Sequence, residues 1–151
     1  MKQSAGILLY RKDKTNKLEV FLVHPGGPFF AKKDEGYWTI PKGEIEEGED
    51  PLIAAKREFH EETATELEGD FHSLGEIKQK GGKIVQAWAI EGDIDADKIV
   101  SNTFEIEWPP RSGKKKSFAE IDKAGWFSLE EALVKINAAQ RAFLESLHAL
   151  I

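Results

Sequence analysis

The chain has 151 residues, of which 40% are hydrophobic and 32% are charged, and this composition argues against a disordered chain. The net charge of −6 makes a nucleic-acid polymer a poor candidate partner. No apolar run reaches 18 residues and there is no cysteine, which predicts no transmembrane helix and excludes disulfides and thiolate metal sites. We expect one domain over residues 1–151, located in the cytoplasm and without a membrane partner.

The N-terminal part alternates between apolar stretches and turns. Residues 5–11 and 18–24 favour strands, and the polar segment 13–17 between them predicts an antiparallel hairpin. Residues 25–28, Pro-Gly-Gly-Pro, predict a loop. Residues 37–40 form a short strand candidate that a proline ends.

A helix is predicted after the acidic loop at residues 43–50. Asp50 is a favourable N-cap residue, and Pro51 suits the first helical position. Apolar side chains at helical spacing, including Phe59, continue to about Thr63.

The C-terminal half predicts further strands and then helices. Residues 71–79 and 83–91 predict a second hairpin, residues 93–120 are expected to be irregular, and residues 124–127 predict a short strand. A Ser-x-x-Glu capping box at Ser128 begins a helix, and Asn137 with Gln140 predicts a second helix start before a helical stripe that includes Phe143 and Leu147. Strands around one central helix, followed by C-terminal helices, predict a mixed α/β domain.

The predicted helix carries three carboxylates on one side. Glu58, Glu61 and Glu62 lie within an arc of roughly 100° on a helical wheel, one turn apart. A solvated acidic face is one interpretation of such a cluster. The other is a cation site, because oxygen ligands at this density suit Mg²⁺ or Mn²⁺.

The spacing around this helix resembles the Nudix box. The matching residues are Gly43, Glu49, Arg57, Glu58, Phe59, Glu61 and Glu62. Ala64 and Thr65 depart from the family pattern, which has a glycine and an aliphatic residue there. Alanine is disfavoured in a left-handed helix cap, so the helix is expected to end differently from those of the family.

The resemblance extends beyond the box and implies both fold and activity. Residues 36–43 are similar to subgroups that cleave diadenosine polyphosphates, and residues 102–105 and 108–113 resemble a bacterial branch of predicted Nudix pyrophosphohydrolases. The family fold is an α/β/α sandwich with a mixed sheet. The family hydrolyses a nucleoside diphosphate linked to another group, so a dinucleoside polyphosphate is the first substrate candidate and a nucleoside triphosphate the second. ADP-ribose, nucleotide sugars and inositol polyphosphates are the further alternatives.

The resemblance also implies roles for the box residues. Glu58, Glu61 and Glu62 would bind Mg²⁺ or Mn²⁺ together with the carbonyl of Lys42, and Gly43 would allow the close approach of the backbone. Glu58 and Glu61 are the central catalytic candidates, and Glu58 is a candidate base.

Two further catalytic candidates would support these carboxylates. Arg57 would orient the ligands through an ion pair with Glu49, although a weak surface ion pair is the alternative. Glu120 is the candidate for an acidic group outside the box, ahead of Glu105 and Glu107, because it precedes the predicted strand at residues 124–127.

Several side chains outside the box are candidate substrate contacts. Aromatic rings could stack on a base or pack in the core, and cations could bind phosphates or form a solvated charge run. The candidates are Tyr37, Trp38, Lys42, Arg111, Lys114 and Lys115, with Trp108 and Lys116 beside them.

The sequence therefore predicts a metal-dependent pyrophosphohydrolase that acts on a small-molecule nucleotide. A nucleotide-binding regulatory module on the same fold is the alternative, and loss of box carboxylates would favour it. All of those carboxylates are present. The oligomeric state is left open.

Overall fold

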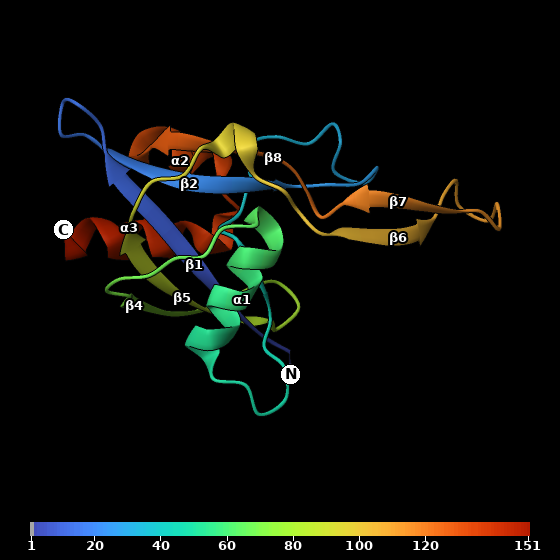
Figure 1. Cartoon of the computed structure of the whole chain (residues 1–151), viewed down its shortest axis with the longest axis horizontal. Helices are drawn as coiled ribbons and strands as arrows, with labels where there is room; N and C mark the ends of the chain where they lie inside the picture. Colours follow the sequence, from blue (N-terminus) through green and yellow to red (C-terminus); the bar gives the residue numbers. More distant parts are fainter. Residues whose placement is uncertain (1) are drawn as a thin grey trace.

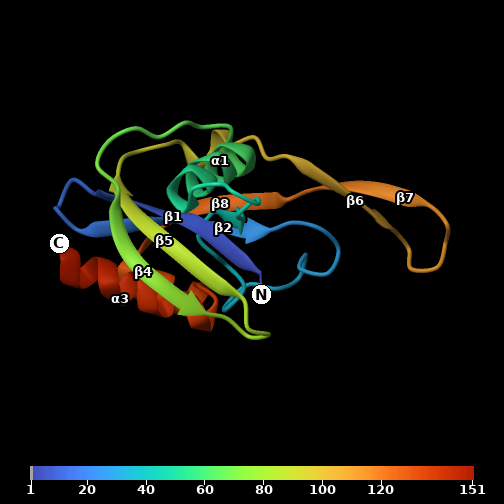
Figure 2. The same ribbon diagram turned by 90° about the horizontal axis from the view of Figure 1, so that it is seen from below.

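The computed structural model describes residues 2–151 and contains a mixed sheet between two helical layers (Figures 1 and 2). The strands are β1 (Gln3–Lys12), β2 (Leu18–Pro25), β3 (Lys42–Glu44), β4 (His72–Lys78), β5 (Ile84–Glu91), β6 (Thr103–Glu107), β7 (Lys115–Ala119) and β8 (Ile121–Ser128). The helices are α1 (Pro51–Thr63), α2 (Leu129–Lys135) and α3 (Arg141–Leu150), with short 3₁₀ turns η1 (Ala96–Lys98) and η2 (Ala138–Gln140).

The main sheet has the strand order β4-β5-β1-β2-β8, and β3 also pairs with β1. The β1–β5 pair is parallel, whereas the other pairs are antiparallel, which confirms the predicted mixed sheet and both predicted hairpins. Strand β1 is central and buried on both faces, as a nearly continuous apolar strand should be.

Alternating side chains of the sheet enter two core clusters. Ile7 and Leu9 pack with Phe59 of α1 on one face. Leu8 and Leu22 pack with the apolar face of α3 on the other. Figure 2 shows α1 and α3 on opposite sides of the sheet, so the predicted sandwich is confirmed.

The start of helix α1 agrees with the sequence-based prediction, whereas its C-terminal end does not. The Asp50 carboxylate accepts hydrogen bonds from the backbone amides of Leu52 and Ile53, at 3.1 and 3.2 Å. At the C-terminus Ala64 does adopt the left-handed conformation, with φ 60° and ψ 22°. The expectation of a different helix end was wrong, because the cap hydrogen bond from Ala64 N to the His60 carbonyl still forms.

The structure differs from the predicted elements in three more places. Residues 37–40 form only isolated bridges, and the acidic loop begins with the short strand β3, which pairs with β1. Residues 93–120, predicted to be irregular, contain the paired strands β6 and β7. We call residues 103–119 the ribbon, and Figures 1 and 2 show it projecting from the body of the protein.

The first strand of the ribbon has a recognisable sequence pattern, but the residues that follow it make the pattern hard to detect. Polar and apolar side chains alternate through β6, as in a strand with one covered face. The prolines and lysines that follow β6 hide this signal, because they belong to the turn and the solvent-exposed start of β7. Within residues 2–151, no helix has the length and apolar character needed to cross a membrane.

Candidate active site

The three predicted carboxylates lie together on α1 beside β3. Glu62 is only 6% exposed, which is unusual for a glutamate, and its Oε2 accepts a hydrogen bond from the Lys42 backbone amide at 3.2 Å. The Glu58 side chain is 13% exposed, whereas Glu61 is 35% exposed. Helical spacing therefore presents a graded set of oxygen atoms, from the buried Glu62 to the accessible Glu61.

The crowding of these carboxylates changes their acidity. Burial raises the pKa of Glu62 to about 8, and the nearby Glu58 adds to the rise. Burial also raises the pKa of Glu58, with a further contribution from Glu61. Negative charge at this site is thus disfavoured unless a cation compensates it.

Gly43 provides the space for Glu58. A Cβ atom at position 43 would lie 2.0 Å from Glu58 Cδ. Strand β3 holds Gly43 in register with Ala5 of β1, so the backbone cannot easily move away. The glycine thus allows close approach of the Glu58 carboxylate, which is the contact that a larger side chain would remove.

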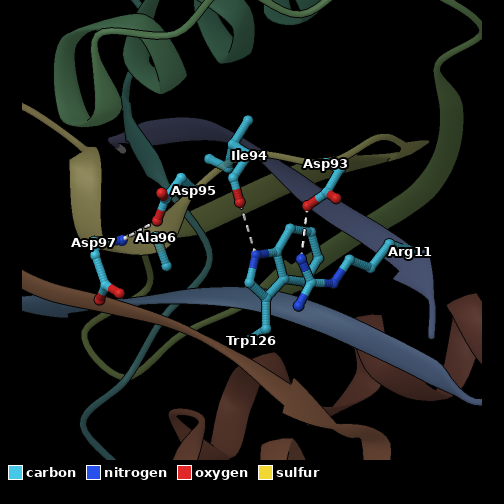
Figure 3. A pocket seen from close by; sticks show the side chains of 7 residues that line it. All are labelled: Arg11, Asp93, Ile94, Asp95, Ala96, Asp97 and Trp126. Atoms are coloured by element: carbon cyan, nitrogen blue, oxygen red, sulfur yellow. Dashed lines mark hydrogen bonds and ion pairs between the residues drawn. The ribbon is translucent and has the colours of Figure 1, made fainter. Parts of the chain in front are cut away.

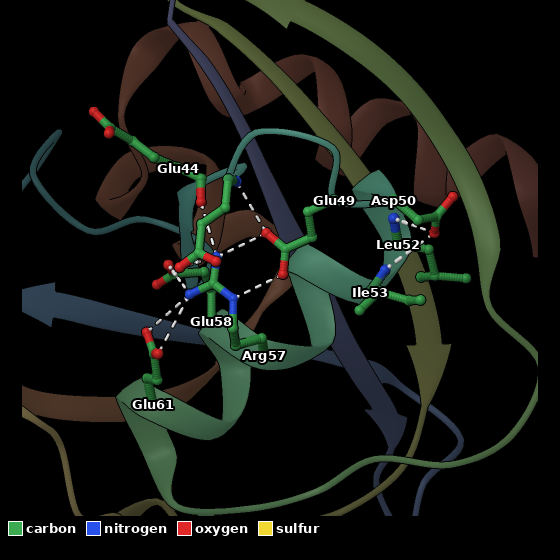
Figure 4. A network of polar contacts seen from close by, with 9 residues as sticks. Glu44, Glu49, Asp50, Leu52, Ile53, Arg57, Glu58 and Glu61 are labelled. Carbon is green, nitrogen blue, oxygen red and sulfur yellow. Dashed lines mark hydrogen bonds and ion pairs between the residues drawn. The ribbon is translucent and has the colours of Figure 1, made fainter.

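Arg57 connects the acidic loop to the carboxylates, as Figure 4 shows. Its Nε and Nη2 donate to the two oxygens of Glu49, at 2.9 and 3.0 Å, and its Nη1 donates to Glu58 Oε1 at 2.9 Å and to Glu61 at 3.3 Å. This two-point contact lowers the pKa of Glu49 to about 2. The predicted ion pair therefore forms, and it orients Glu58 and Glu61.

Glu120 lies close to the box carboxylates. It raises the pKa of both Glu58 and Glu62, while burial and then Glu61 raise the pKa of Glu120 itself. Backbone hydrogen bonds place it there, because Glu120 N donates to Asn102 O at 2.8 Å and Asn102 N donates to Glu61 O at 3.0 Å. The structure thus places Glu120 beside the box carboxylates.

The oxygen donors of this cluster fit a hard divalent cation. Glu58, Glu61, Glu62 and Glu120 supply carboxylates, the donor type that Mg²⁺ and Mn²⁺ prefer. Within residues 2–151, no three acidic or histidine side chains converge on one point as metal ligands. Glu58 and Glu61 instead accept hydrogen bonds from Arg57, and Glu62 accepts one from the Lys42 amide.

Lys42 lies beside this acidic cluster, and Lys83 lies near Lys42. Burial lowers the pKa of Lys42, as does the neighbouring Lys83, while Glu62 and Glu58 act in the opposite direction. The sequence does not single out Lys83, because it is a lone cation after the predicted hairpin turn. Its proximity to Lys42 depends on the pairing of β5 and β3 with β1, a long-range feature.

The two predicted aromatic contacts differ in accessibility. Trp38 is buried and packs edge-to-face on Phe127 at 4.9 Å, while its Nε1 donates to Asp34 at 2.7 Å. Its ring belongs to the core, so the structure does not offer it to a base. Tyr37 is 41% exposed and has the Lys33 ammonium 5.6 Å from its ring centroid.

The predicted basic contacts other than Lys42 are separated from the carboxylates. Arg111 and Lys114 lie in the turn that joins β6 to β7, and Lys115 begins β7. This turn is the end of the ribbon that lies farthest from the body in Figures 1 and 2. The structure does not bring these cations together with Glu58 and its neighbours.

A cavity of about 530 Å³ lies away from the carboxylates, between η1, β8 and the outer end of β1 (Figure 3). Most of its polar groups are already paired. Arg11 binds Glu19 at 2.9 Å and Asp93 at 2.6 Å, and Trp126 Nε1 donates to the Ile94 carbonyl at 3.0 Å. Gly43 pairs with β1 near its opposite end, so this cavity is separate from the carboxylate site.

The mixed sheet between two helical layers, with the carboxylate cluster on α1, can be compared with known protein families. The NUDIX domain family matches residues 1–147, so the chain belongs to this family. No curated protein matches the chain.

Solved structures show the same fold. The Ap4A hydrolase of C. elegans, in a binary complex, is 26% identical over 99% of this chain and 97% of that chain, with a TM-score of 0.66. A mutT/nudix family protein from Listeria innocua is 18% identical over 99% and 92%, with a TM-score of 0.65. The NUDIX domain of Shewanella oneidensis NrtR, complexed with ADP ribose, is 16% identical over 98% and 86%, with a TM-score of 0.66.

Proposed function

We propose that this chain is a metal-dependent pyrophosphohydrolase whose substrate is a dinucleoside polyphosphate, with nucleoside triphosphates as the second candidate. Membership of the NUDIX family implies hydrolysis of a pyrophosphate bond in a substrate that contains a nucleoside diphosphate. The observation that carries the proposal is the cluster of Glu58, Glu61, Glu62 and Glu120 around Gly43. The likeness to an Ap4A hydrolase supports the choice of substrate.

Glu58, Glu61 and Glu62 would hold Mg²⁺ or Mn²⁺. When bound, the cation neutralises phosphate oxygens and makes water a better nucleophile. Arg57 keeps Glu58 and Glu61 in position, which leaves the more exposed Glu61 facing the solvent side. Glu58 and Glu120 are the groups that orient the attacking water or accept its proton, because both have a raised pKa and adjoin the other carboxylates.

Lys42 and Lys83 provide the positive charge that a polyphosphate requires beside the cation. Lys42 is half-buried on β3, and Glu58 and Glu62 act on its charge. A regulatory module that binds nucleotide without cleaving it is the alternative function. The complete set of box carboxylates supports catalysis, because a binding module has no need for such crowded negative charge.

The proposal is tested with purified protein, Mg²⁺ or Mn²⁺, and a panel of diadenosine tetraphosphate, ATP and ADP-ribose, with products separated by chromatography. We expect cleavage of diadenosine tetraphosphate with a higher kcat/KM than ADP-ribose. The exposed loop variant Glu47→Gln is the charge-matched control for Glu61→Gln, because Glu47 lies outside the box pattern. A panel without any metal-dependent cleavage would favour the binding module.

A further inference from the structure

Exposed aromatic side chains are confined to one segment of the described chain. Within residues 2–151, the aromatic residues classed as exposed are Phe29, Phe30 and Tyr37, at 63%, 36% and 41%. All three lie in residues 26–37, which we call the aromatic loop. Exposed apolar surface of this kind commonly marks a binding site.

The aromatic loop packs against the ribbon at two points. The rings of Phe29 and Trp108 meet edge-to-face with centroids 5.6 Å apart. Closer to the body, a Cβ on Gly27 would lie 2.9 Å from the Phe104 ring, so this approach depends on glycine. The loop and the ribbon thus form one surface, in which Phe29 remains accessible.

One face of the ribbon continues this surface. Directly paired residues of β6 and β7 project to the same side, so Phe104, Phe118, Ile106 and Lys116 share a face. Trp108 follows Ile106 by two residues and therefore lies on that face as well. Lys115, which pairs with Glu107, lies on the opposite face. The sequence-based choice of Lys115 as a phosphate contact does not fit this alternation, whereas Lys116 does.

The surface begins at the carboxylates and extends away from them. Gly26 N donates to the Glu120 carbonyl at 2.8 Å, so both the loop and the ribbon start beside Glu120. The five residues of β6 span about 17 Å at a rise of about 3.3 Å per residue. A ligand that contacts both Glu61 and Trp108 must therefore be elongated.

The charge of this surface also differs from that of the remaining chain. Residues 26–37 and 103–119 contain six basic and four acidic side chains, a net charge of +2. The other residues contain 15 basic and 23 acidic side chains, a net charge of −8. Aromatic rings interspersed with cations suit a ligand that has both a planar base and phosphate groups.

We propose that Phe29 and Trp108 bind the second nucleoside of a dinucleoside polyphosphate, the one distant from the bond that is cleaved, and that Lys116 binds the phosphates between. This inference rests on the proposed function and adds to it a reason for substrate length. A nucleotide with a single nucleoside at the carboxylates leaves the aromatic surface empty. The surface therefore determines specificity and does not take part in the chemical step.

The test compares diadenosine tetraphosphate with adenosine tetraphosphate, which lacks only the second nucleoside. We expect Trp108→Ala to lower kcat/KM for diadenosine tetraphosphate roughly 10-fold, mainly through KM, as the loss of one stacked base predicts. The value for adenosine tetraphosphate should stay the same. Trp108→Phe should restore most of the loss, and Lys116→Gln should weaken the longer substrate more than Lys115→Gln does.

Val134→Ala is the matched control, because Val134 is 48% exposed on α2, outside the loop and the ribbon. An equal effect of Trp108→Ala on both substrates would overturn the proposal. So would a Trp108-dependent preference for RNA with a 5′-triphosphate over diadenosine tetraphosphate. If the wild-type protein cleaves neither substrate, the proposed function fails, and calorimetric binding of both compounds with Mg²⁺ still decides whether Trp108 recognises the second nucleoside.

Discussion

Helix α1 and the ribbon support their polar side chains in different ways. Phe59 of α1 is buried against the sheet, whereas no ribbon residue belongs to either core cluster. Glu58 and Glu62 are therefore held in place by a helix that packs on the sheet. Trp108 and Lys116 instead belong to a two-stranded ribbon that has no packed core of its own. In the function proposed above, the chemical step belongs to the packed region and the recognition of substrate length to the projecting region.

The largest effect that this comparison predicts is at Glu61. Glu61→Gln removes the charge of a proposed metal ligand while keeping the size of the side chain, and we expect turnover to fall by roughly 10³-fold or more, with the fold intact. Steady-state kinetics and circular dichroism measure the two quantities. A near-normal rate would show that this face of α1 is not the metal site.

The next effect is at Gly43, where Ala would displace the Glu58 carboxylate. The colliding atoms are the flexible end of a side chain, so Glu58 can move without unfolding the protein. We expect Gly43→Ala to lower kcat roughly 10- to 100-fold, because a small misplacement of a reacting group has a cost of this order. The thermal midpoint should change little. A large loss of stability with normal specific activity would contradict the role assigned to Gly43.

A smaller effect concerns the stability of the metal-free protein. Because the folded-state pKa of Glu62 is about 8 against an ordinary 4.5, the folded state binds this proton more tightly than the unfolded state. The resulting stability is complete below pH 4.5 and is lost as the pH rises through 8. Glu62→Gln should remove this dependence and stabilise the protein at pH 8 by on the order of a few kcal/mol.

Thermal unfolding in excess chelator, from pH 5 to 8.5, measures this difference between the wild type and Glu62→Gln. The Gln side chain can still accept the hydrogen bond from Lys42 N, so the variant isolates the charge. If the thermal midpoints of the two proteins changed with pH in the same way, the pKa of Glu62 would not be raised in the folded state.

The smallest effect is at the end of α1. Ala64 has φ 60°, a conformation that disfavours side chains with a Cβ atom. Ala64→Gly, which restores the residue of the family pattern, relieves this conformational cost. The greater entropy of the unfolded glycine chain offsets part of the gain, so we expect the free energy of unfolding to rise by about 0.5–1 kcal/mol. Activity should be unchanged. A destabilised variant would indicate that Ala64 makes contacts that offset its conformational cost.

The sequence predicted α1 and its carboxylates because their signals are local. Asp50, the helical spacing and the box motif all lie within a single segment, and the geometry of one helix brings Glu58, Glu61 and Glu62 together. Glu120 was predicted from its position before a strand, and backbone contacts to Asn102 place it at the site.

The features that the sequence did not predict depend on long-range pairing. Lys83 approaches Lys42 only because β5 and β3 flank β1. Lys115 and Lys116 look equivalent in a run of lysines, and only the register with β6 separates their faces. Trp38 is an aromatic residue in an apolar context, a pattern shared by core and binding residues. Its burial depends on contacts with Ile136, which follows α2, and with Phe127 of β8.

The most direct test of the account is the metal dependence of diadenosine tetraphosphate hydrolysis. Product formation is followed by chromatography for the wild type and for Glu61→Gln, each with Mg²⁺ and each with excess chelator. We expect rapid cleavage by the wild type with Mg²⁺ and almost none in the other three conditions. Undiminished hydrolysis in chelator, or equal rates for the two proteins with Mg²⁺, would contradict it.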